Sequence, residues 1–205
     1  MQEQGPLPFD VVPGVSWPGA EVAAPVSAAM YVDFPPVPEG WFATPLGWEG
    51  IAVVVNQDVP LRSLNRKDLT EIYSGRVGDW SELGRGQGSI QPIIPPRDEA
   101  FRRIFLDFVL PQGNVTTLAR IAPTPAEALQ LAAELDGAIA IVPASLNLQN
   151  SAVGIVRIEG TLPEQQAVQD GTYPLRSQIV AGSPKEAEGA LRDWLIWVQA
   201  SQIAE

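Results

Sequence analysis

The chain has 205 residues, of which 45% are hydrophobic, so it is long enough for one large domain or two small lobes with a packed core. Its formal net charge of -11 makes nucleic acid and anionic membrane surfaces poor partners for the molecule as a whole. The absence of Cys and His excludes disulfides and thiol chemistry and removes the commonest general base and transition-metal ligand.

No stretch of the sequence approaches the roughly eighteen consecutive apolar residues of a membrane-spanning helix. The first ten residues, MQEQGPLPFD, lack the pattern of a signal peptide. We therefore expect either a cytoplasmic protein or a mature or trimmed form of an exported one.

Apolar runs separated by Pro and Gly predict strands along the whole chain. The strongest is GIAVVVN at residues 50–56, whose nearly continuous β-branched side chains indicate burial on both faces of a sheet. The expected strands cover residues 9–12, 28–34, 50–56, 90–94, 138–142, 153–158 and 175–181, and a polar stretch without regular structure is expected from 159 to 171.

Capping signatures predict helices between these strands. Asn65 with Asp68 marks the start of one helix, and Thr124 with Glu127 marks another that has Pro125 in its first turn. Helices are expected at residues 15–24, 66–73 and 125–135. Another is expected after Asp98, where Phe101, Ile104, Phe105 and Phe108 recur at helical spacing. The last helix is expected to begin at the Ser183–Glu186 signature. Strands and helices alternate, so the predicted fold class is α/β.

The stretch IQPIIPPRDEAF, residues 90–101, is the expected ligand contact. A strand that feeds a helix through a tight turn directs backbone N–H groups and the positive end of the helix dipole at whatever lies beyond it. Asp98 is the predicted N-cap of that helix. However, Asp98 and Glu99 place two carboxylates where an anion-binding loop would have glycines and hydroxyls.

Several motifs carry a resemblance to a known family. They are GIAVVVN at 50–56, SLN at 63–65, EIYSGRVGDWSELG at 71–84, GAIAIVP at 137–143, YPL at 173–175 and LRDWL at 191–195. Together they resemble the phosphate-binding proteins of ABC transporters, over residues 9 to 200. The segment at 71–84 is the most specific of them.

The resemblance implies a two-lobed, periplasmic-binding-protein-like α/β sandwich of type II, with a ligand held in the cleft between the lobes. The first lobe would comprise residues 1–48 and 176–205, and the second lobe residues 49–175. The implied function is that of an extracytoplasmic solute-binding protein, without a cofactor, that binds a small solute, which we expect to be anionic. Its implied partner is an ABC transporter permease.

Two departures from the family pattern alter these expectations. The family's opening strand and helix should precede residue 9, so the first lobe is expected to be incomplete at the N-terminus, and a dimer could complete it. The family's GSGT loop falls on Asp98, Glu99, Ala100 and Phe101. Two like charges about 4 Å apart repel by roughly 4 kcal/mol at an effective dielectric near 20, so Glu99 predicts weak phosphate binding.

Three further residues have both a functional and a structural interpretation. Ser16 falls at the family's second anion-binding loop, or it is a helix N-cap. Asp33 lies near the family's proton-accepting carboxylate, or it forms a turn at a strand end. Arg97 can pair with an anion, or it neutralises Asp98 or Glu99.

Other function classes also remain open from the sequence. Asp98 and Glu99 are adjacent at a helix start and rarely face one site, so without His or Cys no enzyme is expected. Asp33, Asp98 and Glu99 would form an oxygen-only site suited to Ca²⁺ or Mg²⁺. The main alternative is a degenerate binding-protein fold that acts as a sensory or protein-interaction module.

Overall fold

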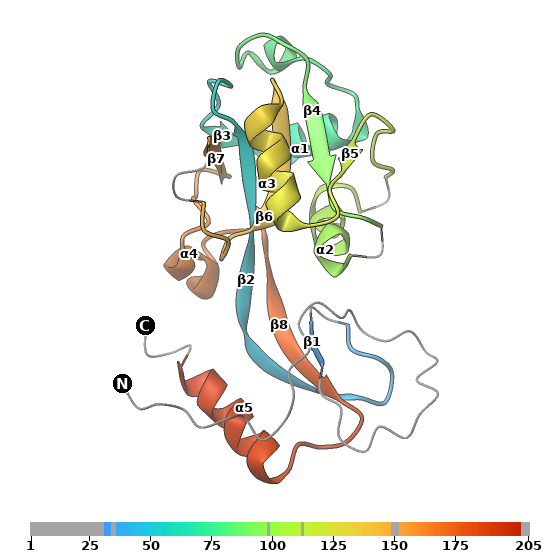
Figure 1. The fold of residues 1–205 in the computed structure, drawn as a ribbon, viewed down its shortest axis with the longest axis vertical. Helices are drawn as coiled ribbons and strands as arrows, with labels where there is room; N and C mark the ends of the chain where they lie inside the picture. Colours follow the sequence, from blue (N-terminus) through green and yellow to red (C-terminus); the bar gives the residue numbers. More distant parts are fainter. Residues whose placement is uncertain (1–30, 34–35, 98, 112, 149–151, 202–205) are drawn as a thin grey trace. The chain divides into compact units, whose positions relative to one another are not determined.

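The computed structural model describes residues 31–33, 36–97, 99–111, 113–148 and 152–201 (Figure 1). Their elements in chain order are β1 (Tyr31–Asp33), β2 (Phe42–Asn56), β3 (Ser63–Leu64), α1 (Arg66–Ser74), the 3₁₀ helix η1 (Trp80–Leu83), β4 (Gln91–Ile94), α2 (Ala100–Val109), β5 (Arg120–Ile121), α3 (Pro125–Glu134), β6 (Ala138–Pro143), β7 (Val153–Ile158), α4 (Gln165–Asp170), β8 (Arg176–Ser183) and α5 (Gly189–Ser201).

The chain divides into two compact units. The first comprises residues 1–47 and 178–205, and the second comprises residues 48–177. Both boundaries fall inside strands, because β2 and β8 each run from one unit into the other, and the two strands are hydrogen-bonded neighbours in the sheet. In the first unit, β1 pairs with β8 in antiparallel register, with Tyr31 opposite Gly182.

The second unit is built on a mixed sheet in the order β2, β6, β4, β5. β2 and β6 are antiparallel, whereas β4 is parallel to both β6 and β5. β7 pairs with residues 53–56 of β2 on the edge opposite to β6, and it carries the short β3 on its other side. This order brings the carboxyl ends of β4 and β5 to the same edge of the sheet.

Helices cover the sheet of the second unit on both faces. On one face, Ala128 and Ala132 of α3 pack on a cluster that includes Ala52, Val54 and Ile93. The alternate side chains of β2 and β6, which point to the opposite face, are equally buried. The predicted burial of residues 50–56 on both faces is therefore confirmed.

Helices α1 and α2 pack against each other through Tyr73 and Phe105, whose rings meet edge to face with centroids 4.7 Å apart. Such an aromatic pair contributes about 0.5–1.5 kcal/mol beyond its buried area. The same Phe105 lies on the α2 stripe with Phe101 and Val109. This packing fixes α2, and with it the turn that precedes α2.

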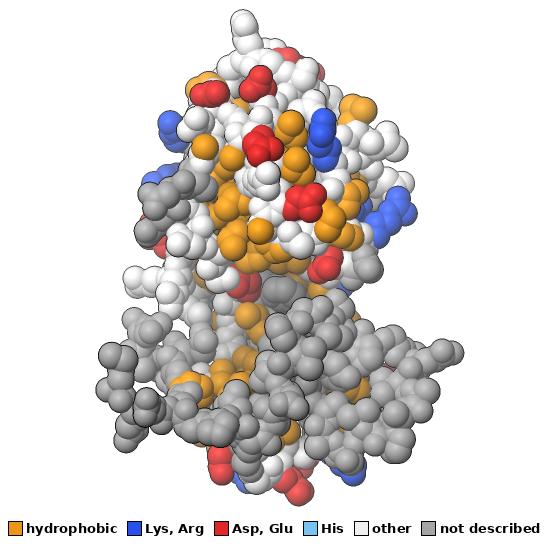
Figure 2. Space-filling model, viewed as in Figure 1, with side chains coloured by type: hydrophobic (Ala, Val, Ile, Leu, Met, Phe, Trp, Pro, Cys, Tyr) orange, Lys and Arg blue, Asp and Glu red, His pale blue; other side chains and the backbone are white. Residues whose placement is uncertain are grey.

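The surface of the second unit carries acidic and apolar side chains interspersed over α3, with Lys and Arg fewer on the same face (Figure 2). Exposed carboxylates of α3 include Glu127 and Glu134. Among the described residues, no helix is both long enough and apolar enough to span a bilayer.

The structure confirms the strands expected at 90–94, 138–142 and 153–158 and the helices expected at 66–73 and 125–135, within a residue or two at each end. The strand expected at 50–56 is also present, but β2 begins eight residues earlier, at Phe42. Two expectations are wrong. The stretch after residue 158 contains helix α4, and the last helix begins at Gly189 instead of at the Ser183–Glu186 signature, because β8 continues through Ser183. The elements expected at 9–12 and 15–24 lie outside the described residues, and of the strand expected at 28–34 only β1 is described.

Candidate functional site

The turn between β4 and α2 is the part of the expected site that the structure describes in most detail. β4 ends at the buried Ile94, and Pro95 and Pro96, both half-buried, follow. Two consecutive prolines have fixed φ angles and no N–H groups, so they end the strand pairing and hold the chain extended. Arg97 and Glu99 come next, both with exposed side chains.

The N-cap of α2 is Glu99, which corrects the expectation that Asp98 holds this position. Glu99 has an extended backbone at φ -73° and ψ 125°, and its side chain makes no capping hydrogen bond. N-caps favour short side chains whose oxygen can reach back to the first turn, and glutamate is not among them. Asp98 itself lies outside the described residues.

Arg102, in the first turn of α2, reaches back to this turn. Its side chain is only 8% exposed, and its Nη1 donates to the carbonyl oxygen of Pro95 at 2.8 Å. Burial lowers the pKa of the Arg102 guanidinium, and the positive charge of Arg97 lowers it further. The turn and the first turn of α2 therefore carry two guanidinium groups, Arg97 exposed and Arg102 buried.

The structure brings four of the expected site residues together, namely Arg97, Glu99, Ala100 and Phe101. The Phe101 side chain is buried on the apolar stripe of α2 and does not face a ligand at the turn. Asp33 is the last residue of β1, in the other unit, and its backbone is paired with Val180. Ser16 lies outside the described residues.

No group of three or more carboxylates of the kind that binds a metal ion occurs in the described part of the chain. The oxygen-only site considered from the sequence includes Asp98, which is outside that part. A Ca²⁺ or Mg²⁺ site therefore has no support among the residues that are described.

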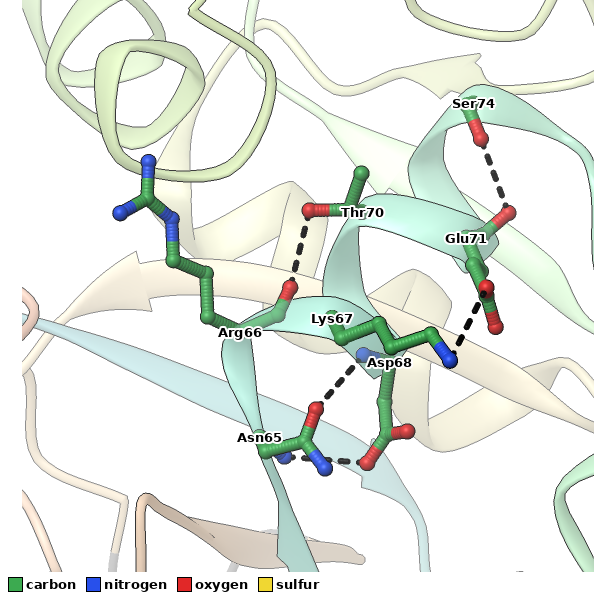
Figure 3. A network of polar contacts seen from close by, with 7 residues as sticks. All are labelled: Asn65, Arg66, Lys67, Asp68, Thr70, Glu71 and Ser74. Atoms are coloured by element: carbon green, nitrogen blue, oxygen red, sulfur yellow. Dashed lines mark hydrogen bonds and ion pairs between the residues drawn. The ribbon is translucent and has the colours of Figure 1, made fainter.

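A second polar region surrounds the start of α1. An open pocket of about 620 Å³ is lined by Asn65, Arg66, Lys67, Thr70 and Glu159. Figure 3 shows the network that fixes this helix start, in which Asn65 and Asp68 cap each other's backbone N–H groups. Glu159 accepts the Arg66 N–H at 2.8 Å, so side chains of the protein itself already accept the N–H groups of Asn65, Arg66 and Asp68 at this helix start.

Arg102 is the site residue that the sequence did not reveal. The signal was nevertheless present, because an arginine at position 102 falls on the same helical stripe as Phe105 and Val109. A charged residue on an apolar stripe is either exposed at its edge or buried with a partner. Only the structure shows that the partner is the Pro95 carbonyl.

The α/β architecture, with two strands that pass between two compact units, is typical of periplasmic binding proteins. Residues 38–202 match the family described as the PBP superfamily domain, and the chain belongs to this family. The α/β binding-protein fold expected from the motifs is thereby confirmed.

Individual relatives agree with this assignment. The phosphate-binding protein PstS of Bacillus subtilis (strain 168) is 25% identical over 154 residues, which is 75% of this chain and 51% of that protein. The chain therefore spans about half the length of this curated relative. The match also confirms the resemblance to phosphate-binding proteins that the motifs indicated.

Two solved structures show the same fold. A phosphate ABC transporter substrate-binding protein with bound phosphate from Clostridium perfringens is similar with a TM-score of 0.73 and 16% identity, over 85% of this chain and 76% of that chain. An ABC-type phosphate transport receptor from Vibrio cholerae has a TM-score of 0.71 and 18% identity, over 85% and 75%.

Proposed function

We propose that this chain is a solute-binding domain of an ABC transporter that binds a small oxyanion of the phosphate class. The observation that carries the proposal is the 154-residue likeness to the phosphate-binding protein PstS, within a chain that belongs to the PBP superfamily. The role is non-enzymatic and extracytoplasmic, and the protein partner is a transporter permease.

The turn between β4 and α2 provides the chemistry for an oxyanion. The exposed guanidinium of Arg97 presents a fork of N–H donors that matches two oxygens of a phosphate or related anion. The first turn of α2 adds the positive end of the helix dipole. Together these groups make an anion site on a chain that is acidic overall.

The same turn weakens the binding of a dianion. Glu99 is exposed at the start of α2, and its carboxylate repels a second negative charge. Water screens an exposed carboxylate, so this repulsion amounts to about 1 kcal/mol, less than the roughly 4 kcal/mol of two charges 4 Å apart at an effective dielectric near 20. The site should therefore favour monoanionic forms or bind phosphate with modest affinity.

Thermal unfolding with and without added oxyanion tests the proposal. At fixed ionic strength, phosphate at a hundred times its dissociation constant stabilises the folded state by about 2.7 kcal/mol. For a chain of this size that shift corresponds to roughly 5–10 °C in the unfolding midpoint. Sulfate, molybdate and Ca²⁺ are measured in parallel, because they separate oxyanion binding from a cation site.

Two variants locate the binding site. E99Q removes the repelling carboxylate and should tighten phosphate binding several-fold, by about 1 kcal/mol. E134Q makes the same change in net charge at Glu134, an exposed carboxylate of α3 that lies outside the turn, and should leave affinity unchanged. Failure of every oxyanion to move the midpoint of both wild type and E99Q would overturn the proposed function.

A further inference from the structure

The guanidinium of Arg102 occupies a position where an apolar side chain would be expected. It is buried on the α2 stripe with Phe101, Phe105 and Val109. Moving a charge out of water is unfavourable unless hydrogen bonds and an opposite charge compensate for it. Leucine or methionine at this position would fill the same space without that cost.

The contact that Arg102 makes is with the first residue of the turn. The hydrogen bond from its Nη1 to the Pro95 carbonyl, at 2.8 Å, links the start of α2 to the end of β4. Inside this loop, the Glu99 N–H donates to the Pro96 carbonyl at 3.3 Å. The bond from Arg102 to Pro95 therefore spans the turn that carries Arg97 and Glu99, and it encloses the shorter bond between Glu99 and Pro96.

The charge of Arg102 also acts on the turn. The pKa of its guanidinium is lowered first by burial and second by the charge of Arg97, so the two cations repel each other in the ligand-free protein. An anion that pairs with Arg97 relieves this repulsion. Arg102 thereby strengthens anion binding at Arg97 through its charge.

We propose that Arg102 is a positioning residue for oxyanion binding: its hydrogen bond to the Pro95 carbonyl holds the end of β4 against the start of α2, and its buried positive charge adds to that of Arg97. The ligand part of this inference rests on the proposed function. The part that concerns the turn does not, because the hydrogen bond exists in the ligand-free protein.

The test compares wild type with R102M and R102K in two measurements. Hydrogen exchange of the backbone amides between residues 96 and 103 is followed in the ligand-free protein, and phosphate affinity is measured by calorimetry at several salt concentrations. R102M fills the space but loses both the hydrogen bond and the charge. R102K keeps the charge but has one donor nitrogen in place of the planar guanidinium.

We expect R102M to raise amide exchange in the turn by about tenfold, with no change in β6, and to weaken phosphate binding by about tenfold. R102K should recover part of the affinity and, with it, the salt dependence that R102M loses. R85Q removes a positive charge from Arg85, an exposed side chain outside the turn, and serves as the charge-matched control that leaves both measurements unchanged. Should R102M fail to fold, R102K alone supplies the comparison of exchange and affinity with wild type.

Unchanged exchange in the turn of R102M would overturn the inference whether or not phosphate binds. Raised exchange together with equal phosphate affinity in wild type and R102M would also overturn it. Raised exchange in a protein that binds no oxyanion would overturn the proposed function, and would support only the closure of the turn by Arg102.

Discussion

Glu159 adopts a backbone conformation that is unusual for its residue type. It has φ at 50°, and it is followed by Gly160 at φ 86° in a two-residue turn closed by reciprocal hydrogen bonds between Ile158 and Thr161. Such turns favour Asn, Asp or Gly at the first position, because a larger side chain is strained at positive φ. The Glu159 carboxylate offsets that strain by accepting the N–H of Arg66 at the start of α1.

This balance predicts different outcomes for two substitutions of Glu159. E159A keeps the backbone strain and loses the bond to Arg66, so it should lower the free energy of unfolding by about 1 kcal/mol. E159G loses the same bond but relieves the strain, which is worth about 1 kcal/mol, so it should be close to neutral. Urea unfolding of both variants measures the difference.

The comparison between E159A and E159G isolates the strain, because both variants lack the carboxylate. Equal stabilities of the two variants would show that residue 159 carries no strain. A wild type no more stable than E159A would show that the bond to Arg66 contributes nothing.

At the residue scale, the sequence predicted where the anion turn lies but not how it is held. Arg97, Glu99, Ala100 and Phe101 fall in one turn because they are neighbours in the chain, and a strand followed by a helix start is visible in the sequence. The contact of Arg102 with Pro95 depends on which way a single side chain turns on α2. Sequence spacing does not determine that direction.

Among the elements, the starts of helices α1 and α3 are the features that the sequence predicted best. The predicted capping box of α1 is present in full, with Asn65 and Asp68 each accepting the other's N–H. At α3, Thr124 accepts the N–H of Glu127 as predicted, and Pro125 occupies the first turn. These motifs are local, so the sequence alone is sufficient to reveal them.

The 3₁₀ helix η1 is fixed by a capping box that the sequence did not reveal. Asp79 accepts hydrogen bonds from the N–H and hydroxyl of Ser81, and Glu82 accepts the N–H of Asp79. The hydroxyl and the N–H of Ser81 both lower the pKa of Asp79. The ionised carboxylate is therefore the form that stabilises this element.

The lowered pKa of Asp79 predicts a dependence of stability on pH. A carboxyl whose pKa is lower in the folded state stabilises the fold above its unfolded value, which is about 3.9, and loses this effect as pH falls through the folded value. D79N should therefore be less stable than wild type at pH 5–7, and the difference should shrink below about pH 4. Urea unfolding across this pH range measures it.

The S81A background provides the control for D79N. Without the Ser81 hydroxyl, the largest cause of the lowered Asp79 pKa is removed, so the effect of D79N should be smaller. A difference between wild type and D79N that persists unchanged at pH 3 would contradict the role of the ionised carboxylate.

The elements that the sequence missed depend on tertiary contacts. α4 has six residues, and its N-cap, Glu164, makes no side-chain hydrogen bond, so no local signal marks it. Its last turn is held instead by Arg176, whose Nη1 donates to the carbonyls of Val168 and Gln169 at 2.6 and 3.0 Å. Likewise, β8 continues through Ser183 because residues up to Gly182 pair with β1, which overrides the apparent capping signature.

At the scale of the whole molecule, the described core is concentrated in the second unit. Every buried apolar residue in the described part of the chain lies within residues 48–177, except Leu46, Val180, Ala181 and Leu195. The two ends of this segment are also tied to each other. The Arg176 guanidinium stacks over the Trp48 ring at 3.9 Å, and the Ile51 N–H donates to the Leu175 carbonyl at 2.8 Å.

These contacts predict that a fragment of residues 48–177 folds alone. A segment of this size with one contiguous core and joined ends should unfold cooperatively in urea. R176M breaks the stack on Trp48 and the bonds to α4, and should lower the unfolding free energy of the fragment by about 2 kcal/mol. A fragment that unfolds without cooperativity would show that residues outside 48–177 are needed to complete its core.

The same fragment separates the expected ligand contacts into two groups. Arg97, Glu99 and Arg102 lie inside it, whereas Ser16 and Asp33 lie outside. If the turn carries most of the binding energy, the fragment should bind phosphate within about tenfold of the affinity of the full chain, a difference of about 1.4 kcal/mol. If the full chain binds phosphate and the folded fragment does not, the deciding contacts lie in residues 1–47 or 178–205. Ser16 and Asp33 would then be the first residues to substitute.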